Sequence, residues 1–321
     1  MSYIVTGGAG FIGSCIVRTL NDMGVDDIII VDDIASTEKW KNISNKRFTE
    51  YVHKDRFIEK LHTLEDVSCI IHMGACSSTT ENDFDYLYIN NFEYTEKLWN
   101  FCAEREIPFL YASSAATYGD GCLGFGDSMD IRQLLPLNGY GYSKQLFDLW
   151  AEKQVKRPPQ HVGMKFFNVY GPNEYCKGAM ASVIFHSFNS MKKNGRIRLF
   201  KSYHADCANG EQKRDFLYVK DLCEVIKFFL RHHEISGLFN LGTGHAESFN
   251  TLAASVFDAL GLKTDIEYVE MPEALKAKYQ YFTQADMRKL KNAGYMQPFH
   301  DLRSGAADYV CNYLNRDFQI Y

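Results

Sequence analysis

No stretch of this 321-residue sequence approaches the roughly 20 consecutive apolar residues that a bilayer-spanning helix needs. The most apolar short run, residues 28–31, lies between the acidic pairs Asp26-Asp27 and Asp32-Asp33, and this pattern predicts a buried strand. The chain passes from Met1-Ser2 into a strand-like run without a basic segment, so we expect no leader. These features predict a protein without a membrane partner.

Cysteine and histidine are present, but not in the patterns of a structural or metal site. The nine cysteines are odd in number, scattered, and free of any Cys-x-x-Cys pair. The adjacent His232 and His233 would point apart on a helix. The sequence therefore argues against a disulfide framework and a zinc ribbon, and predicts a reducing cytoplasm and no bound metal.

An excess of basic charge is also missing. Lys plus Arg number 35 and Asp plus Glu number 40, which gives a net charge of −5 and no electrostatic reason to expect a nucleic-acid partner. The hydrophobic content of 46% and the charged content of 23% are typical of a packed globular protein and exclude disorder. The length suits one large domain or two unequal lobes.

Strand-like and helix-like segments alternate through the first half of the chain. We predict strands at residues 3–6, 27–31, 48–52, 68–73 and 108–112, and helices at 11–24, 89–104 and 143–156. This alternation predicts an α/β fold, a Rossmann-like doubly wound parallel sheet with a smaller C-terminal substrate lobe. We expect residues 1–167 to form the dinucleotide-binding domain, with 215–244 returning to it, and 168–214 and 245–321 to form the substrate-binding lobe.

A glycine-rich turn joins the first predicted strand to the first predicted helix. Its glycines are Gly7, Gly8, Gly10 and Gly13, and the positions predicted to contact a cofactor are Gly7, Gly10, Phe11, Ile12 and Gly13. Glycines at this spacing permit a tight turn and a close approach of the backbone to a pyrophosphate, and the helix N-terminus then receives the anion. The context predicts a dinucleotide site.

Acidic and basic residues near the second and third predicted strands give conflicting signals about the cofactor. Asp32 follows Gly13 by 19 residues, where a carboxylate can bind the ribose hydroxyls of NAD. Lys39 and Lys54 lie where the adenosine would sit, and two ammonium groups could neutralise a 2′-phosphate despite Asp32 and Asp33. From the residues alone, NAD, NADP and simple solvation of both lysines remain open.

Tyr140 and Lys144 are four residues apart, which places them on one face of a helix. A nearby ammonium favours tyrosinate, so we expect Lys144 to lower the pKa of Tyr140 and the pair to relay protons in hydride chemistry. Ser114 lies in a hydroxyl-rich run at the end of a predicted strand, where it can hydrogen-bond a substrate carbonyl. A solvated helix face is the alternative.

These motifs resemble those of the extended short-chain dehydrogenase/reductase family, which acts on sugar nucleotides. Within that family, the resemblance is greatest to the enzymes that act on ADP-heptose, and it runs nearly from end to end. It rests on residues 73–81, 104–119, 167–172, 177–183, 213–216 and 279–286. The resemblance implies an enzyme that epimerises C6 of ADP-glycero-manno-heptose from D-glycero to L-glycero, by transient oxidation and re-reduction with bound NADP, in lipopolysaccharide core synthesis. It also suggests a cytoplasmic homo-oligomer.

The resemblance assigns further roles by position. Ser114, Tyr140 and Lys144 match the active-site trio, and Lys177 matches a second acid/base that also contacts substrate. Lys39 and Lys54 match adenosine-phosphate contacts, which favours NADP over NAD. The other matched cofactor contacts are Asp32, Asp33, Met73, Gly74, Ala75, Cys76, Ser77, Asn90, Lys144 and Val169. The matched substrate contacts are Asn168, Ala179, His186, Phe200, Arg214 and Tyr279.

Three features depart from the family pattern. Asp33 replaces a usual Asn, which adds negative charge near a 2′-phosphate. Ala179 replaces a serine that contacts substrate, so one hydrogen bond must be missing or come from elsewhere. Residues 201–212 form a longer and different segment.

A second acid/base has a chemical reason. After oxidation, a flat ketone must present its other face, and its oxygen then lies on the opposite side of the site. One donor cannot serve both geometries, so we expect Tyr140 to act in one and Lys177 in the other. Phosphate binding is the alternative role of Lys177, while the fork of Arg214 suits a diphosphate.

Two other functions are compatible with the sequence. One is a different sugar-nucleotide enzyme of the same family, such as a 4-epimerase, a reductase or a 4,6-dehydratase. Ala115-Ala116 stand where a dehydratase needs an acid to expel water, which disfavours dehydration. The other is a non-enzymatic NADP-binding relative, which the intact Ser114, Tyr140 and Lys144 disfavour.

Overall fold

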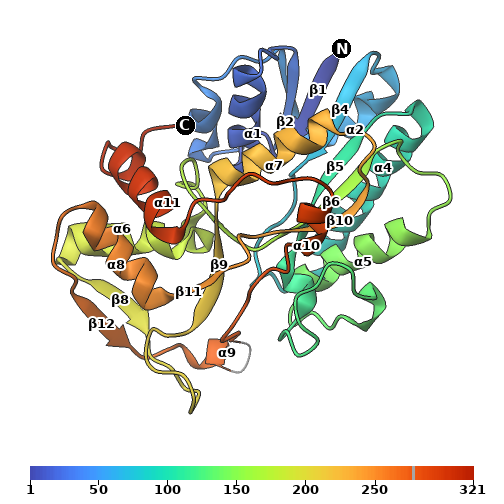
Figure 1. Cartoon of the computed structure of the whole chain (residues 1–321). Helices are drawn as coiled ribbons and strands as arrows, with labels where there is room; N and C mark the ends of the chain where they lie inside the picture. Colours follow the sequence, from blue (N-terminus) through green and yellow to red (C-terminus); the bar gives the residue numbers. More distant parts are fainter. Residues whose placement is uncertain (277–278) are drawn as a thin grey trace.

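A seven-stranded parallel sheet forms the centre of the computed structural model, which describes residues 1–276 and 279–321 (Figure 1). The strand order is β10-β6-β5-β4-β1-β2-β3. The strands are β1 (Ser2–Thr6), β2 (Ile28–Asp32), β3 (Glu50–His53), β4 (Val67–His72), β5 (Phe109–Ser114), β6 (His161–Phe166) and β10 (Gly237–Leu241). The predicted fold class, a Rossmann-like doubly wound sheet, is confirmed.

Helices cover both faces of this sheet because its strands are apolar on both sides. They are α1 (Phe11–Asp22), α2 (Lys54–Lys60), α3 (Phe84–Leu87), α4 (Tyr94–Arg105), α5 (Gly139–Lys153) and α7 (Val219–Arg231). Val5 of β1 belongs to the buried cluster that contains Leu222 of α7, and α1 packs beside α7. Ile4, the residue before Val5 in β1, points to the opposite face of the sheet. There it belongs to the buried cluster that contains Trp99 of α4 and Phe147 of α5.

Several element boundaries differ from the predicted ones by a few residues, and three of the differences have consequences. α5 begins at Gly139 rather than at residue 143, because the Asn138 side chain caps it by accepting from Gly141 N (2.8 Å). The predicted helix at 89–104 is longer, since α3, a π-helical turn (Tyr88–Glu93) and α4 follow one another without a break. The third strand begins two residues later than predicted, at Glu50.

Smaller sheets and helices make up the rest of the chain. β7 (Asn168–Tyr170), β9 (Lys213–Tyr218) and β11 (Ala246–Ser248) form a three-stranded sheet, and β8 (Ile197–Phe200) pairs with β12 (Ile266–Val269). The remaining helices are α6 (Val183–Asn194), α8 (Phe249–Ala259), α9 (Glu273–Lys276), α10 (Arg288–Asn292) and α11 (Leu302–Tyr309). Figure 1 shows α6, α8, β8 and β12 gathered at the end of the molecule away from β1.

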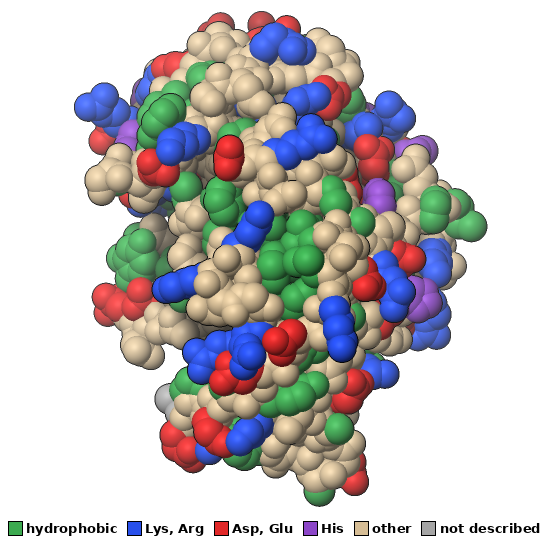
Figure 2. Space-filling view, turned by 90° about the vertical axis from the view of Figure 1, so that its left-hand side faces the viewer, with side chains coloured by type: hydrophobic (Ala, Val, Ile, Leu, Met, Phe, Trp, Pro, Cys, Tyr) green, Lys and Arg blue, Asp and Glu red, His purple; other side chains and the backbone are tan. Residues whose placement is uncertain are grey.

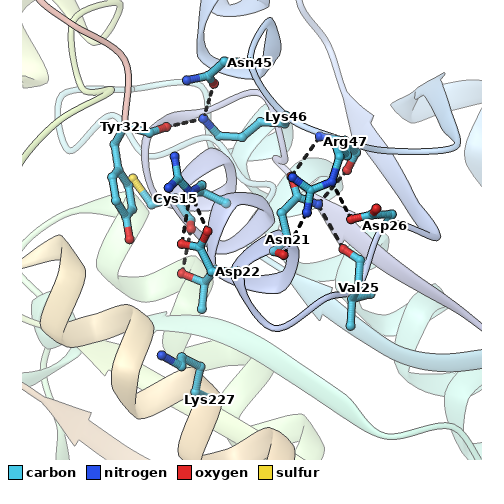
Figure 3. A network of polar contacts seen from close by, with 12 residues as sticks. Cys15, Asn21, Asp22, Val25, Asp26, Asn45, Lys46, Arg47, Lys227 and Tyr321 are labelled. Carbon is cyan, nitrogen blue, oxygen red and sulfur yellow. Dashed lines mark hydrogen bonds and ion pairs between the residues drawn. The ribbon is translucent and has the colours of Figure 1, made fainter.

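The segment that ends at Tyr321 packs against the first helix. Figure 3 shows Lys46 between the main-chain oxygen of Tyr321 and the side chain of Asn45, to both of which it donates hydrogen bonds. The guanidinium of Arg18, on α1, lies 5.4 Å from the centre of the Tyr321 ring. Burial lowers the pKa of Lys46 to about 8. These contacts hold Tyr321 beside α1, the helix that follows the glycine-rich turn.

The surface carries mixed charge. On the face shown in Figure 2, lysine and arginine side chains are interspersed with acidic ones rather than gathered into one basic patch. Within residues 1–276 and 279–321, no helix combines the length and the apolar character that crossing a membrane requires. In the same residues, no cluster of three or more His, Cys, Asp or Glu side chains is arranged to hold a metal ion.

Candidate active site

A cavity of about 690 Å³ opens at the carboxyl edge of the large sheet. Its walls come from segments that follow β1, β4, β5 and β6, and the strand order reverses between β1 and β4, where ligands of open α/β sheets bind. The predicted site residues that line it are Gly7, Gly10, Phe11, Ile12, Gly13, Asp32, Lys39, Met73, Gly74, Ala75, Cys76, Ser77, Ser114, Tyr140, Lys144, Asn168, Val169 and Lys177.

The glycine-rich turn forms one wall of this cavity and has no room for side chains. Gly7 has a φ of +64°, and a Cβ there would lie 2.7 Å from Gly74 N. A Cβ at Gly13 would lie 2.1 Å from Gly7 O. Gly10 N donates to Gly7 O (2.9 Å) directly before α1 begins. The turn is therefore a backbone cradle at a helix N-terminus, which suits a diphosphate.

Asp32 and Lys39 lie at the end of the cavity near β2. One carboxylate oxygen of Asp32 accepts from Ala9 N (2.9 Å), and the other accepts from Asp33 N (2.7 Å) and from Lys39 Nζ (2.6 Å). Both residues line the cavity, and Asp32 is only 7% exposed. The ammonium of Lys39 therefore neutralises the carboxylate that the sequence assigns to a ribose.

The other predicted adenosine contacts lie beside the cavity and do not line it. Lys54 Nζ donates to Asn90 Oδ1 (3.2 Å) and to Asp55 Oδ1 (3.1 Å). Asp33 lies 3.5 Å from His53 Nε2, so a histidine faces its added negative charge. The roles of Asp33, Lys54 and Asn90 stay predictions.

The predicted trio comes from two elements that meet at the cavity. Ser114 ends β5, where its Oγ accepts from Ala116 N (3.1 Å). Tyr140 lies in the first turn of α5, and Lys144 follows one turn later. Lys144 Nζ donates to Ala112 O (2.9 Å), which ties α5 to β5. All three trio side chains line the same cavity.

The expected effect of Lys144 on Tyr140 is wrong for this structure. Burial raises the pKa of Tyr140, and the neighbouring Ser114 side chain only partly offsets that rise. The ammonium of Lys144 is directed to the Ala112 carbonyl, and its own pKa is lowered to about 8 by burial, which Asp148 opposes. Tyr140 therefore keeps its phenol proton near pH 7.

Lys177 lines the cavity next to Phe11, the first residue of α1. Its ammonium lies 5.3 Å from the centre of the Phe11 ring. Burial lowers the pKa of Lys177, and the nearby Glu174 opposes this. Glu174 is fully buried and accepts from Ser182 N (2.6 Å) and Ser182 Oγ (2.6 Å), so it closes the loop that carries Lys177. Tyr140 and Lys177 thus reach one cavity from different elements, since Tyr140 belongs to α5 and Lys177 to the segment between β7 and α6.

Arg214 lies on β9 next to the cavity without lining it. Its guanidinium donates to the main-chain oxygens of Gln280 and Lys213 and lies 5.2 Å from the centre of the Tyr279 ring. It is 7% exposed, and no carboxylate in the described part of the chain forms an ion pair with it. Burial lowers its pKa. Gln280 does line the cavity. The guanidinium of Arg214, which has no carboxylate partner in the described residues, therefore lies directly behind Gln280.

Other predicted substrate contacts lie outside the cavity lining. Ala179 and His186 are exposed, the latter on α6, and Phe200 at the end of β8 is 37% exposed. Residues 201–212 connect β8 to β9 and also lie outside the lining. The substrate-contact roles of these residues stay predictions.

Several lining residues were not predicted. They are Thr37, Asn42, Ser78, Thr79, Ala112, Ser113, Ala115, Ala116, Phe166, Phe167, Asn173, Cys176, Met180, Gln280 and Thr283. Most are chain neighbours of predicted residues, so widening each motif by a few positions would have found them. Asn42 and Asn173 are different, since Asn42 Nδ2 bridges Ala9 O (3.0 Å) and Asn173 O (3.1 Å) across three distant segments.

Comparison with known proteins agrees with this geometry. Residues 3–242 match the model of the NAD dependent epimerase/dehydratase family. This chain belongs to that family. The matched residues include the glycine-rich turn, the trio and Lys177, and the family is one of NAD(P)-dependent enzymes.

Individual members of the epimerase/dehydratase family sharpen the comparison. The chain is 50% identical, over 98% of each chain, to the ADP-L-glycero-D-manno-heptose-6-epimerase of Fusobacterium nucleatum. The solved ADP-L-glycero-D-manno-heptose-6-epimerase of Helicobacter pylori matches with a TM-score of 0.81 at 24% identity, covering 97% of this chain and 95% of that one. A UDP-N-acetylglucosamine 4-epimerase from Methanobrevibacter ruminantium matches with a TM-score of 0.83 at 22% identity, covering 98% of each. At these low identities the structural matches show the fold alone.

Proposed function

We propose that this chain interconverts the C6 epimers of ADP-glycero-manno-heptose, from D-glycero to L-glycero, by transient oxidation and re-reduction with bound NADP. The observation that carries the proposal is the 50% identity over 98% of the chain to an epimerase of that name. The cavity supports it, because the residues that the chemistry needs line one space. The resulting L-glycero sugar nucleotide supplies heptose for a lipopolysaccharide core.

The residues of the cradle fit a dinucleotide. Gly7 and Gly13 let the turn pack closely against Gly74 and against itself, and this brings the N-terminus of α1 to the cavity, where a diphosphate can lie. When bound there, a nicotinamide cofactor supplies the acceptor and then the donor of a hydride. The preference for NADP rests on Lys39, which neutralises Asp32 so that a 2′-phosphate meets no net repulsion from that carboxylate.

Two side chains move the proton of the C6 oxygen. Tyr140, Ser114 and Lys177 all line the cavity, and Lys177 lies next to Phe11. In one orientation of the sugar, either Tyr140 or Lys177 accepts the hydroxyl proton as the hydride leaves C6, and in the other orientation the second of the two donates a proton to the ketone oxygen as the hydride returns. The raised pKa of Tyr140 keeps its phenol protonated, ready to donate to the ketone oxygen.

Arg214 lies behind the cavity wall on the side of β9, next to Gln280. A buried guanidinium without a carboxylate partner suits the diphosphate of a sugar nucleotide, to which it can donate two parallel hydrogen bonds. Tyr279 packs against the guanidinium and orients it. We also propose a cytoplasmic location and a homo-oligomer.

Purified protein incubated with either ADP-heptose epimer tests this function. We expect both epimers to reach the same ratio from either start, without added cofactor, because the hydride returns to the sugar it left. UDP-sugars serve as the comparison, since a 4-epimerase of the same fold would act on them. Action on UDP-sugars at C4, with no change in ADP-heptose, would contradict the proposal.

A further inference from the structure

An ion pair lies directly behind the wall that carries the trio. Lys165 Nζ is 2.7 Å from Asp148 Oδ2, and the two side chains are 1% and 0% exposed. Neither side chain lines the cavity. Removing two charges from water is costly, and apolar residues of similar size often serve stability as well or better. Packing alone therefore does not explain why the chain has an ion pair at this buried position.

Asp148 connects α5 to β5. It lies one turn after Lys144, and its Oδ2 also accepts from Ser113 Oγ (2.7 Å). Its Oδ1 accepts from Tyr111 OH (3.2 Å). Both donors belong to the strand that ends at Ser114, so one carboxylate gathers two side chains of that strand.

Lys165 connects β6 to the turn after β5. It lies opposite Ser113 in the sheet, and its Nζ donates to Thr117 Oγ1 (2.8 Å) as well as to Asp148. Thr117 Oγ1 in turn donates to Ser114 O (2.8 Å). The pair thus holds the backbone on both sides of Ser114 against the helix that carries Tyr140 and Lys144.

Asp148, one member of this pair, also acts on the charge of Lys144. The titratable groups that interact electrostatically with Lys144 are Asp148 on its own helix, His72 at the end of β4 and Cys76 after that strand. Burial and Lys144 lower the pKa of His72 to about 3, so His72 is neutral. Asp148 is then the carboxylate that favours the ammonium form of Lys144, and Lys165 offsets part of its charge.

We propose that Asp148 and Lys165 are positioning residues, which hold the Ser114 segment against α5 and set the charge of Lys144. The roles of Ser114, Tyr140 and Lys144 in this inference rest on the proposed function. The two charges have opposite signs, so removing one or the other must change Lys144 in opposite directions. A merely structural pair would not produce that pattern.

The test titrates Lys144 directly by NMR of protein labelled with ¹³Cε-lysine, with the resonance assigned through Lys144→Arg. In Asp148→Asn, we expect the pKa of Lys144 to fall by about one unit, because the stabilising carboxylate is gone. In Lys165→Met, we expect it to rise by about one unit, because Asp148 is no longer offset. Lys165→Arg should restore the wild-type value. Shifts in the same direction, or none, would overturn the proposal.

Activity provides the second readout. Each single variant should lose about 10²-fold in kcat with little change in KM, as expected for misplaced catalytic groups. If neither single variant folds, Asp148→Asn/Lys165→Met leaves no unpaired buried charge. That double variant should keep the wild-type pKa of Lys144 and lose at least about tenfold in kcat, whereas wild-type turnover would overturn the proposal.

Two controls separate this inference from the proposed function. Lys220→Met breaks the half-buried pair that Lys220 forms with Asp308 (2.6 Å) away from the cavity, and it should leave Lys144 unchanged. A wild-type protein that fails to interconvert ADP-heptose epimers contradicts the proposed function. The titration of Lys144 decides the positioning role in either case, because it needs no turnover.

Discussion

Lys39 Nζ lies 2.6 Å from Asp32 Oδ1, so the carboxylate at the end of β2 is neutralised by a lysine of the cavity wall. In a site that binds NAD through a free carboxylate, that charge would repel a 2′-phosphate. Here the ion pair removes most of the repulsion. This relationship is the basis of the proposed preference for NADP.

The purified protein should therefore retain NADP. We expect denaturation to release NADP in preference to NAD, and Lys39→Ala to reduce NADP content while increasing the share of NAD. Mass spectrometry of the released nucleotides measures both. Lys41→Ala is the matched control, because Lys41 pairs with Glu38 on the exposed surface (2.8 Å). Release of NAD alone from the wild type would contradict the assignment.

Tyr140→Phe and Lys177→Met should each lower turnover by about 10²- to 10⁴-fold, as the loss of a positioned acid or base does. Cofactor content should stay near normal, because neither residue holds the adenosine half. Epimerisation assays with nucleotide analysis of the same samples measure both effects. Lys192→Met, an exposed lysine of α6, is the control. Wild-type turnover by Lys177→Met would rule out the scheme with two bases.

The activity should fall as the pH rises through about 8. Burial lowers the pKa of Lys144 to about 8, so its ammonium is present below that pH and lost above it. If the ammonium form is the active one, kcat has a basic limb there. Lys144→Arg keeps a cation at all these pH values, so its residual activity should lack that limb. A wild-type kcat that stays level well above pH 8 would contradict this role of Lys144.

Asn173 should be critical for stability. It is buried in the left-handed region with a φ of 75°, donates to Ser14 Oγ (2.9 Å) and accepts from Tyr321 N (2.9 Å). Asn173→Ala should lower the free energy of unfolding by about 2–4 kcal/mol, combining lost hydrogen bonds with backbone strain. Asn173→Gly should lower it by about 1 kcal/mol less, since glycine removes the strain. Equal losses in chemical denaturation would show that strain is not involved.

The local parts of the site could be predicted from the sequence, and the tertiary parts could not. The glycine-rich turn, Asp32 and the Tyr140–Lys144 spacing are each encoded within a few residues of one chain segment. Asn42 and Asn173 were missed because their place at the cavity depends on contacts among segments far apart in sequence.

The errors have similar physical causes. The start of α5 was placed too late, because its Gly139 and Gly141 resemble a helix breaker unless the Asn138 cap is recognised. The pKa of Tyr140 was expected to fall because the helical spacing from Lys144 says nothing about where the ammonium points. In the fold it meets the Ala112 carbonyl, which belongs to another element.

The measurement that tests the account most directly is the fate of solvent hydrogen at C6. The epimerisation is run in deuterated water, and C6 and its neighbours in the product are analysed by NMR and mass spectrometry. Oxidation at C6 with return of the same hydride predicts an inverted C6 that carries no solvent deuterium. Deuterium at C6 of the inverted product would contradict the account, because Tyr140 and Lys177 would then act as bases that deprotonate carbon rather than oxygen.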